Sequence, residues 1–60
     1  MKVYVVTEYA IIEHEEYTQV VGVYPSEEIA REMIQKFNDI AHKKYGYHEY
    51  SYEDFEVYEG

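Results

Sequence analysis

One amphipathic segment, Ser26–Lys44, most constrains the fold of this chain, because it alone combines the length and the periodicity of a helix. Ser26 is a suitable N-cap, and Glu27 and Glu28 fall in the first turn, where the helix dipole favours acids. Gly46 suits the position just past the helix end. The apolar residues recur at the spacing of one buried helix face: Ile29, Ala30, Met33, Ile34, Phe37, Ile40 and Ala41. Such a helix needs a second layer to cover this face.

Three apolar segments around this helix predict strands. The first, Lys2–Ala10, is apolar on both faces at its start, which is typical of a central strand. The second, Tyr17–Tyr24, contains Gly22, which indicates a bulge or a close backbone approach. Pro25 ends this strand because proline has no N–H for the ladder. The third strand lies within Tyr47–Tyr58.

The order strand, strand, helix, strand allows few topologies. The first two strands form a hairpin, and the helix returns the chain so that the third strand lies antiparallel beside the first. We therefore expect residues 1–60 to form a single domain with an α+β fold: ββαβ, with a three-stranded antiparallel sheet in the order 2-1-3 packed on one face by the helix. The helix is expected to cover Val3, Val5, Val21, Val23, Phe55 and Val57. The opposite face, with Tyr4, Val6 and several tyrosines, would stay open, and such a patch is typical of a contact site.

The small size of the chain predicts a need for additional stabilisation. A 60-residue chain buries only about 60% of the surface that its unfolded form exposes. The chain has no cysteine, and its histidines at 14, 42 and 48 are too scattered to predict structural zinc. Self-association or an unusually well-filled core remains, and we expect a homodimer.

Charge and composition exclude several classes of function. With 13 acids against 5 bases, the net charge of −8 argues against direct binding to nucleic acid or to anionic membranes. An aromatic content of 18%, including nine tyrosines, argues against disorder. No apolar run approaches the roughly 18 to 20 residues that span a bilayer, and the N-terminal segment has no signal-peptide pattern. We expect a cytoplasmic protein.

Two groups of polar residues are candidates for chemistry. Glu13–Glu16, the expected hairpin tip, offers carboxylates and His14 to a divalent metal, although the EF-hand and HExxH patterns are absent and a solvated acidic turn is favoured. His48 and Glu49, with His42 at the helix end, are candidates for an acid–base pair. There is no nucleophile elbow, glycine-rich phosphate loop or paired-carboxylate motif. We therefore expect no enzymatic activity, no cofactor and no bound metal.

The tyrosine-rich, acidic segment after Gly46 is the strongest candidate for binding a partner. Same-face residues of a strand lie about 6.5 to 7 Å apart, close to the phosphate spacing of one nucleic-acid strand. A partner with a basic groove could accept this strand as a nucleic-acid mimic; alternatively, the acids only keep the edge soluble and unpaired. The expected partner-binding residues are Tyr4, Tyr50, Tyr52, Glu53, Asp54, Glu56 and Tyr58.

Three motifs also carry a resemblance. The chain opens with KVYVV, enters its helix through VVGVYPSEEIAREMI and closes with YEDFEV. It resembles a family of small bacterial and phage proteins of unassigned activity, in which Ser usually stands at the position of Pro25. Its size and acidity are also similar to those of phage-encoded inhibitors. The leading prediction is a small protein-interaction module, and the alternative is a phage-type inhibitor that mimics nucleic acid to block a host defence or repair enzyme.

Overall fold

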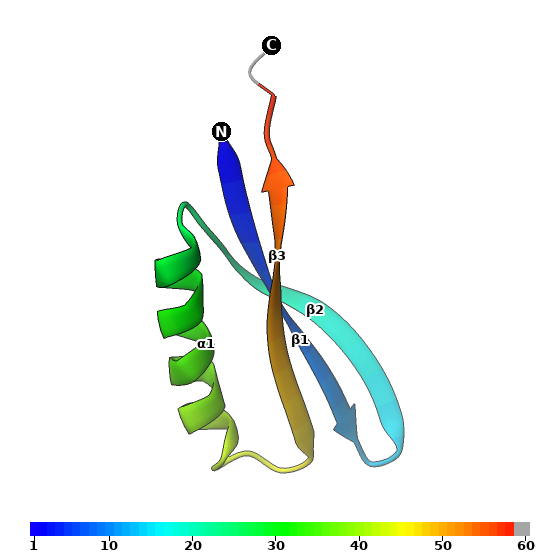
Figure 1. The fold of residues 1–60 in the computed structure, drawn as a ribbon. Coiled ribbons are helices and arrows are strands. Elements are labelled where there is room, and N and C mark those ends of the chain that lie inside the picture. Colours follow the sequence, from blue (N-terminus) through cyan, green and yellow to red (C-terminus); the bar gives the residue numbers. More distant parts are fainter. Residues whose placement is uncertain (59–60) are drawn as a thin grey trace.

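The computed structural model describes residues 1–58, which form three strands and one helix in two layers (Figure 1). In chain order these are β1 (Lys2–Ile12), β2 (Glu15–Tyr24), α1 (Glu27–Ala41) and β3 (Tyr47–Glu56). β1 is central and pairs antiparallel with both neighbours, in the order β2-β1-β3. The predicted α+β fold and strand order are confirmed. Within the described residues, no helix is long and apolar enough to cross a membrane.

The β1–β2 hairpin is tighter than the sequence suggested. Ile12 pairs with Glu15, so the turn consists of Glu13 and His14 alone instead of the expected four residues. Both turn residues have positive φ, 51° and 71° respectively, which resembles a type I′ turn. Asn and Gly adopt this left-handed conformation more readily than Glu and His. The turn pattern was therefore unreadable from the sequence.

The irregularity predicted in β2 is present. The register between β1 and β2 shifts after the pair of Val6 with Gly22, so that Val21 is an extra residue in a β-bulge. A Cβ atom on Gly22 would lie 2.6 Å from Cζ of Tyr24. Glycine at this position therefore lets the tyrosine ring lie directly against the backbone.

The helix begins as predicted and ends earlier. The amide of Ile29 donates to Oγ of Ser26 at 3.2 Å, which confirms Ser26 as the N-cap. The α-helix ends at Ala41 with His42 as its C-cap, and not at Lys44. The next two amides donate to carbonyls three residues earlier at 3.0 Å, which tightens the chain into a turn.

Gly46 does not cap the helix. It lies in the loop that leads into β3 and has a φ of 95°. A Cβ atom here would lie 2.8 Å from the carbonyl oxygen of Ile11. Both the positive φ and the close approach to β1 require glycine.

The helix covers the opposite face of the sheet from the predicted one. On β1, Val6 and Ala10 are fully buried. On β3, the ring of Tyr50 stacks on Phe37 of α1 with a centroid separation of 5.3 Å. The residues that alternate with these therefore lie on the open side. Val5 pairs there with Val23, and Val3 pairs with Phe55. The prediction that the helix packs on these residues is wrong.

The physical reason lies in the side chains that the covered face offers to the helix. The ring of Tyr50 stacks on Phe37, and the Tyr52 hydroxyl donates to Glu27 of α1 at 2.6 Å. Val6 is fully buried on the same face. Apolar patterning had favoured the valine-rich parity, but these contacts with the helix belong to the other one.

Candidate interaction surface

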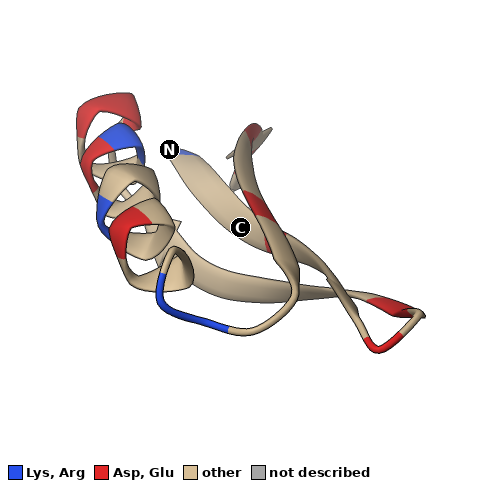
Figure 2. Ribbon diagram, turned by 90° about the horizontal axis from the view of Figure 1, so that it is seen from below, with Lys and Arg blue, Asp and Glu red and all other residues tan. Residues whose placement is uncertain are grey.

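The open side of the sheet carries an apolar patch made of Val3, Val5, Val20, Val23 and Phe55, which we call the valine face. Figure 2 shows α1 on one side of the sheet only. Val20, Val23 and Phe55 are 60%, 56% and 49% exposed. Strand pairing places Val5 beside Val23, and Val3 beside Phe55. The large apolar side chains therefore lie next to one another on three adjacent strands.

The valine face surrounds a shallow depression. Near its centre, Oγ1 of Thr7 and Oγ of Ser51 lie 3.4 Å apart and share a hydrogen bond. The lining residues are Val5, Thr7, Val20, Ser51, Glu53 and Phe55. One of the two hydroxyls donates to the other, and apart from these hydroxyls and the carboxylate of Glu53 the depression is lined by methyl groups and one aromatic ring. Its chemistry fits an apolar surface better than a polar ligand.

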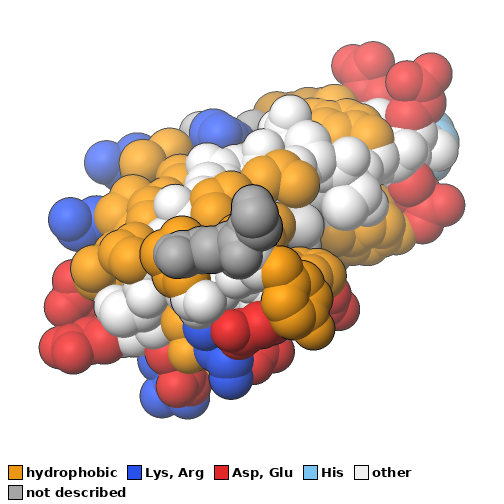
Figure 3. Space-filling view, turned by 90° about the horizontal axis from the view of Figure 1, so that it is seen from above, with side chains coloured by type: hydrophobic (Ala, Val, Ile, Leu, Met, Phe, Trp, Pro, Cys, Tyr) orange, Lys and Arg blue, Asp and Glu red, His pale blue; other side chains and the backbone are white. Residues whose placement is uncertain are grey.

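Towards the hairpin, the same side of the sheet becomes polar and aromatic. The Tyr9 hydroxyl donates to Glu16, and the rings of Tyr9 and Tyr47 meet edge to face at 6.4 Å. The Tyr47 hydroxyl donates to Glu49 at 2.9 Å. Figure 3 shows acidic side chains at both ends of the molecule, with hydrophobic side chains exposed between them. The apolar patch therefore occupies only part of this side.

The acids predicted to mimic nucleic acid do not form one row. Glu53 pairs with Val5 and lies on the open side, whereas Asp54 points the other way. Oδ2 of Asp54 lies 3.3 Å from Nζ of Lys2, and this hydrogen bond raises the pKa of Lys2. Oε1 of Glu56 lies 3.2 Å from the amino group of Met1. Two of the three acids are thus engaged by cations of the same chain.

The predicted partner-binding tyrosines are also separated. Tyr4, Tyr50 and Tyr52 lie on the side covered by the helix and are half-buried, so the prediction of an open tyrosine-rich face is wrong. The Tyr4 and Tyr52 rings are 6.0 Å apart, and the Tyr52 hydroxyl donates to Glu27 of α1 at 2.6 Å. Tyr58 lies beyond β3 and is 89% exposed.

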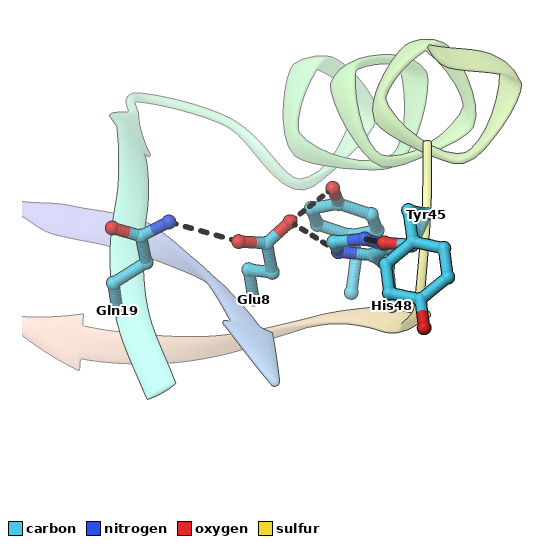
Figure 4. Close-up of polar contacts among 5 residues, drawn as sticks. Glu8, Gln19, Tyr45 and His48 are labelled. Carbon is cyan, nitrogen blue, oxygen red and sulfur yellow. Dashed lines mark hydrogen bonds and ion pairs between the residues drawn. The ribbon is translucent and has the colours of Figure 1, made fainter. Parts of the chain in front are cut away.

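A buried carboxylate lies at the centre of the covered side. Glu8 is only 4% exposed. Its Oε1 accepts from Nε2 of Gln19 at 2.8 Å, and its Oε2 accepts from the Tyr50 hydroxyl (Figure 4). The same Oε2 lies 3.2 Å from Nδ1 of His48, whose Nε2 lies 3.1 Å from the carbonyl oxygen of Tyr45. We call these five residues the Glu8 cluster.

Hydrogen bonding keeps the buried carboxylate charged. The Tyr50 hydroxyl, with smaller contributions from Gln19 and His48, lowers the pKa of Glu8 against the opposing effect of burial. Burial, together with the hydrogen bond to Glu8, raises the pKa of Tyr50 to about 12. Both ring nitrogens of His48 face acceptors, so both contacts are hydrogen bonds only when the ring carries two hydrogens. The cluster joins all three strands around a buried carboxylate, which suits a structural role.

Comparison with known proteins identifies a family. The family model described as Domain of unknown function (DUF7336) matches residues 1–59. The chain belongs to this family. The expected membership in a family of unassigned function is therefore confirmed. No curated protein and no solved structure matches the chain significantly.

In this DUF7336 domain, the predicted acid–base pair is not formed. His48 turns to Glu8 on the covered side, whereas Glu49 lies on the open side beside Tyr9. His42 is the C-cap of the helix. Sequence reasoning missed Glu8, although one signal was available: it is the only acid among the residues of its strand that share its face.

The acidic hairpin tip does not assemble the donor set of a metal site. Among residues 1–58, no group of three His, Cys, Asp or Glu side chains converges on a point where it could hold a metal ion. Glu13 and His14 are exposed in the turn, and Glu16 accepts from Tyr9. The surface that distinguishes the domain is therefore the valine face.

Proposed function

We propose that this domain is a protein-interaction module that binds through the valine face. The observation that carries the proposal is the exposure of Val20, Val23 and Phe55 on a contiguous patch. Soluble proteins rarely leave large contiguous apolar patches open to water. Covering such a patch with protein contributes about 25 cal/mol for each Å² of apolar surface removed from water.

The alternative, a nucleic-acid mimic, has less support. A mimic needs a row of unpaired negative charges that meets a basic groove. Here Asp54 and Glu56 are engaged by Lys2 and the amino terminus, and they point away from Glu53. The net charge of −8 still favours a salt-sensitive contact with any basic partner, so salt dependence separates the two functions.

Affinity capture with matched variants tests the proposal. The full chain is immobilised as wild type, as Val20→Lys and as Gln35→Lys, which adds the same charge on an exposed position of α1. We expect a bound protein that wild type and Gln35→Lys retain at low and high salt and that Val20→Lys loses. A partner that all three retain, or that high salt releases, would contradict binding through the valine face and favour the acidic strand.

A further inference from the structure

We infer that the occupant of the valine face is a second copy of this chain, packed sheet to sheet about a twofold axis. The inference rests on the proposed function, since it takes the valine face to be an interaction surface and names the partner. Two properties of the molecule support a copy of itself, the size of its core and the extent of its surface. The distribution of its charge restricts how two copies can pack.

The core of one chain is unusually small. Within residues 1–58, the fully buried hydrophobic side chains are Val6, Ala10 and Ala30. Domains of this size are only marginally stable alone, and association is one way in which they gain stability. A second copy supplies the missing apolar layer wherever the chain itself is present. A different protein would do so only where the two meet.

The exposed surface is larger than that of a compact monomer. The chain exposes 4732 Å², whereas a folded monomer of 7.3 kDa exposes about 4,200 Å² on average. A second copy that covers the open side of the sheet would remove part of this surface from water.

The side chains of the valine face suit the interior of a sheet-to-sheet contact. Two sheets pack about 10 Å apart, with β-branched and aromatic residues interdigitating between them. In a twofold dimer the same patch meets itself, so Val20, Val23 and Phe55 of one copy face the same group in the other. The two helices then lie on the outside, and the assembly has four layers.

The charged residues restrict where the twofold axis lies. Glu16 and Glu49 lie on the open side near the hairpin, at the positions that pair with Ile11 and Tyr9. An axis through the valine face overlaps the apolar halves and leaves these two acids beyond the overlap, whereas Glu53, which lies beside Val5 on the same side, comes within it. Because each chain carries a net charge of −8, the copies repel at long range. Salt therefore strengthens this dimer, whereas it weakens binding to a basic partner.

Sedimentation equilibrium over a range of protein concentrations tests the inference. The full-length wild type, Val20→Lys and Gln35→Lys are compared at low and high salt, with circular dichroism to monitor folding. We expect wild type and Gln35→Lys to form dimers whose association constant rises several-fold with salt. Val20→Lys places two lysines in one interface, so its association is expected to weaken at least about 100-fold.

A second variant covers the case in which Val20→Lys does not fold. Val20→Thr keeps the β-branched shape and replaces one methyl group by a hydroxyl, so we expect about tenfold weaker association. A wild type that stays monomeric at every concentration would overturn the inference that a second copy covers the valine face. If wild type is monomeric but captures a protein that Val20→Lys loses, the proposed function remains supported. If Val20→Lys retains the captured protein, both the proposed function and the second copy are contradicted. A dimer unaffected by either substitution would also overturn the inference.

Discussion

Both sides of the sheet depart from the usual separation of polar and apolar residues. An antiparallel sheet commonly packs an apolar face against its helix and turns a polar face to water. Here the covered side holds Glu8, Gln19 and Tyr50, and the open side holds the valine face. The helix therefore covers a hydrogen-bonded network, while the residues best suited to a hydrophobic core remain available to another molecule.

Successive residues of β1 belong to opposite sides of the sheet. Val5 belongs to the open side, and its neighbour Val6 is fully buried. Glu8 is buried two residues later, where its carboxylate must be matched by donors because desolvating an unpaired charge is costly. Hydrogen bonds depend on direction more than apolar contacts do, so the covered side is expected to fix the fold and the open side to tolerate substitution.

The largest expected effect comes from the centre of the covered side. Glu8→Ala removes the carboxylate and leaves the Gln19 amide, the Tyr50 hydroxyl and the buried ring of His48 without it. We expect the free energy of unfolding to fall by about 3 to 5 kcal/mol, as measured by urea denaturation followed by circular dichroism. Such a loss is comparable to the whole stability of a small domain.

Two controls keep this first test decisive. Glu53→Ala removes a carboxylate from the open side and is expected to change the free energy of unfolding by no more than about 0.5 kcal/mol. Glu8→Gln preserves the shape and an acceptor oxygen, and is expected to lose about 1 to 3 kcal/mol. Equal losses for Glu8→Ala and Glu53→Ala would remove the distinction between the two sides.

Alkaline pH should weaken the covered side through Tyr50. The pKa of Tyr50 is raised from 10.0 to about 12 in the folded chain, so its protonated form stabilises the fold below pH 10. This contribution is lost as pH rises from 10 to 12, and the shift corresponds to at most about 3 kcal/mol. Tyr50→Phe should show a smaller fall in urea midpoint over this range, whereas Tyr58→Phe, on an 89% exposed residue, should behave as wild type. Identical profiles for all three proteins would show that Tyr50 is not involved.

Val5 and Val6 are neighbours on β1 but lie on opposite sides of the sheet, so replacing each by alanine tests the two sides separately. Val6→Ala opens a cavity at a fully buried position and is expected to lower the free energy of unfolding by about 2 kcal/mol at any protein concentration. Val5→Ala should cost less than about 1 kcal/mol in dilute solution and more as concentration rises, because a second copy then covers the open side. The measurement is thermal unfolding over a concentration series. A concentration-independent effect of Val5→Ala would argue against the dimer.

The sequence predicted the helix and the strands more successfully than it predicted which face of the sheet the helix covers. The period of the apolar residues and the cap at Ser26 located the helix, and the two apolar parities of the first strand placed it in the centre of the sheet. The same double pattern could not decide which parity faces the helix. That choice depends on contacts between distant residues, such as the stacking of Phe37 on Tyr50.

The candidate site was predicted only in part. Val3, Val5, Val23 and Phe55 were recognised as a set that shares one side of the sheet, but they were assigned to the helix. Val20 was missed, because the bulge at Val21 brings it to the side of Val23. The Glu8 cluster could not be predicted because its members come from three strands and meet only once the register is set. A shift of one residue in that register would exchange the two faces completely.

The smallest expected effect concerns the turn that sets this register. Glu13 and His14 both hold left-handed conformations, which Asn and Gly adopt with less strain. Replacing the pair by Glu13→Asn with His14→Gly is expected to raise the free energy of unfolding by about 1 kcal/mol, measured by urea denaturation. As a control, Glu15→Asn with Glu16→Gly puts the same residues into β2, where they should destabilise the strand. If the turn variant brings no gain, the turn is not strained, and the register that separates the two sides must be held by the strand pairs and the Glu8 cluster instead.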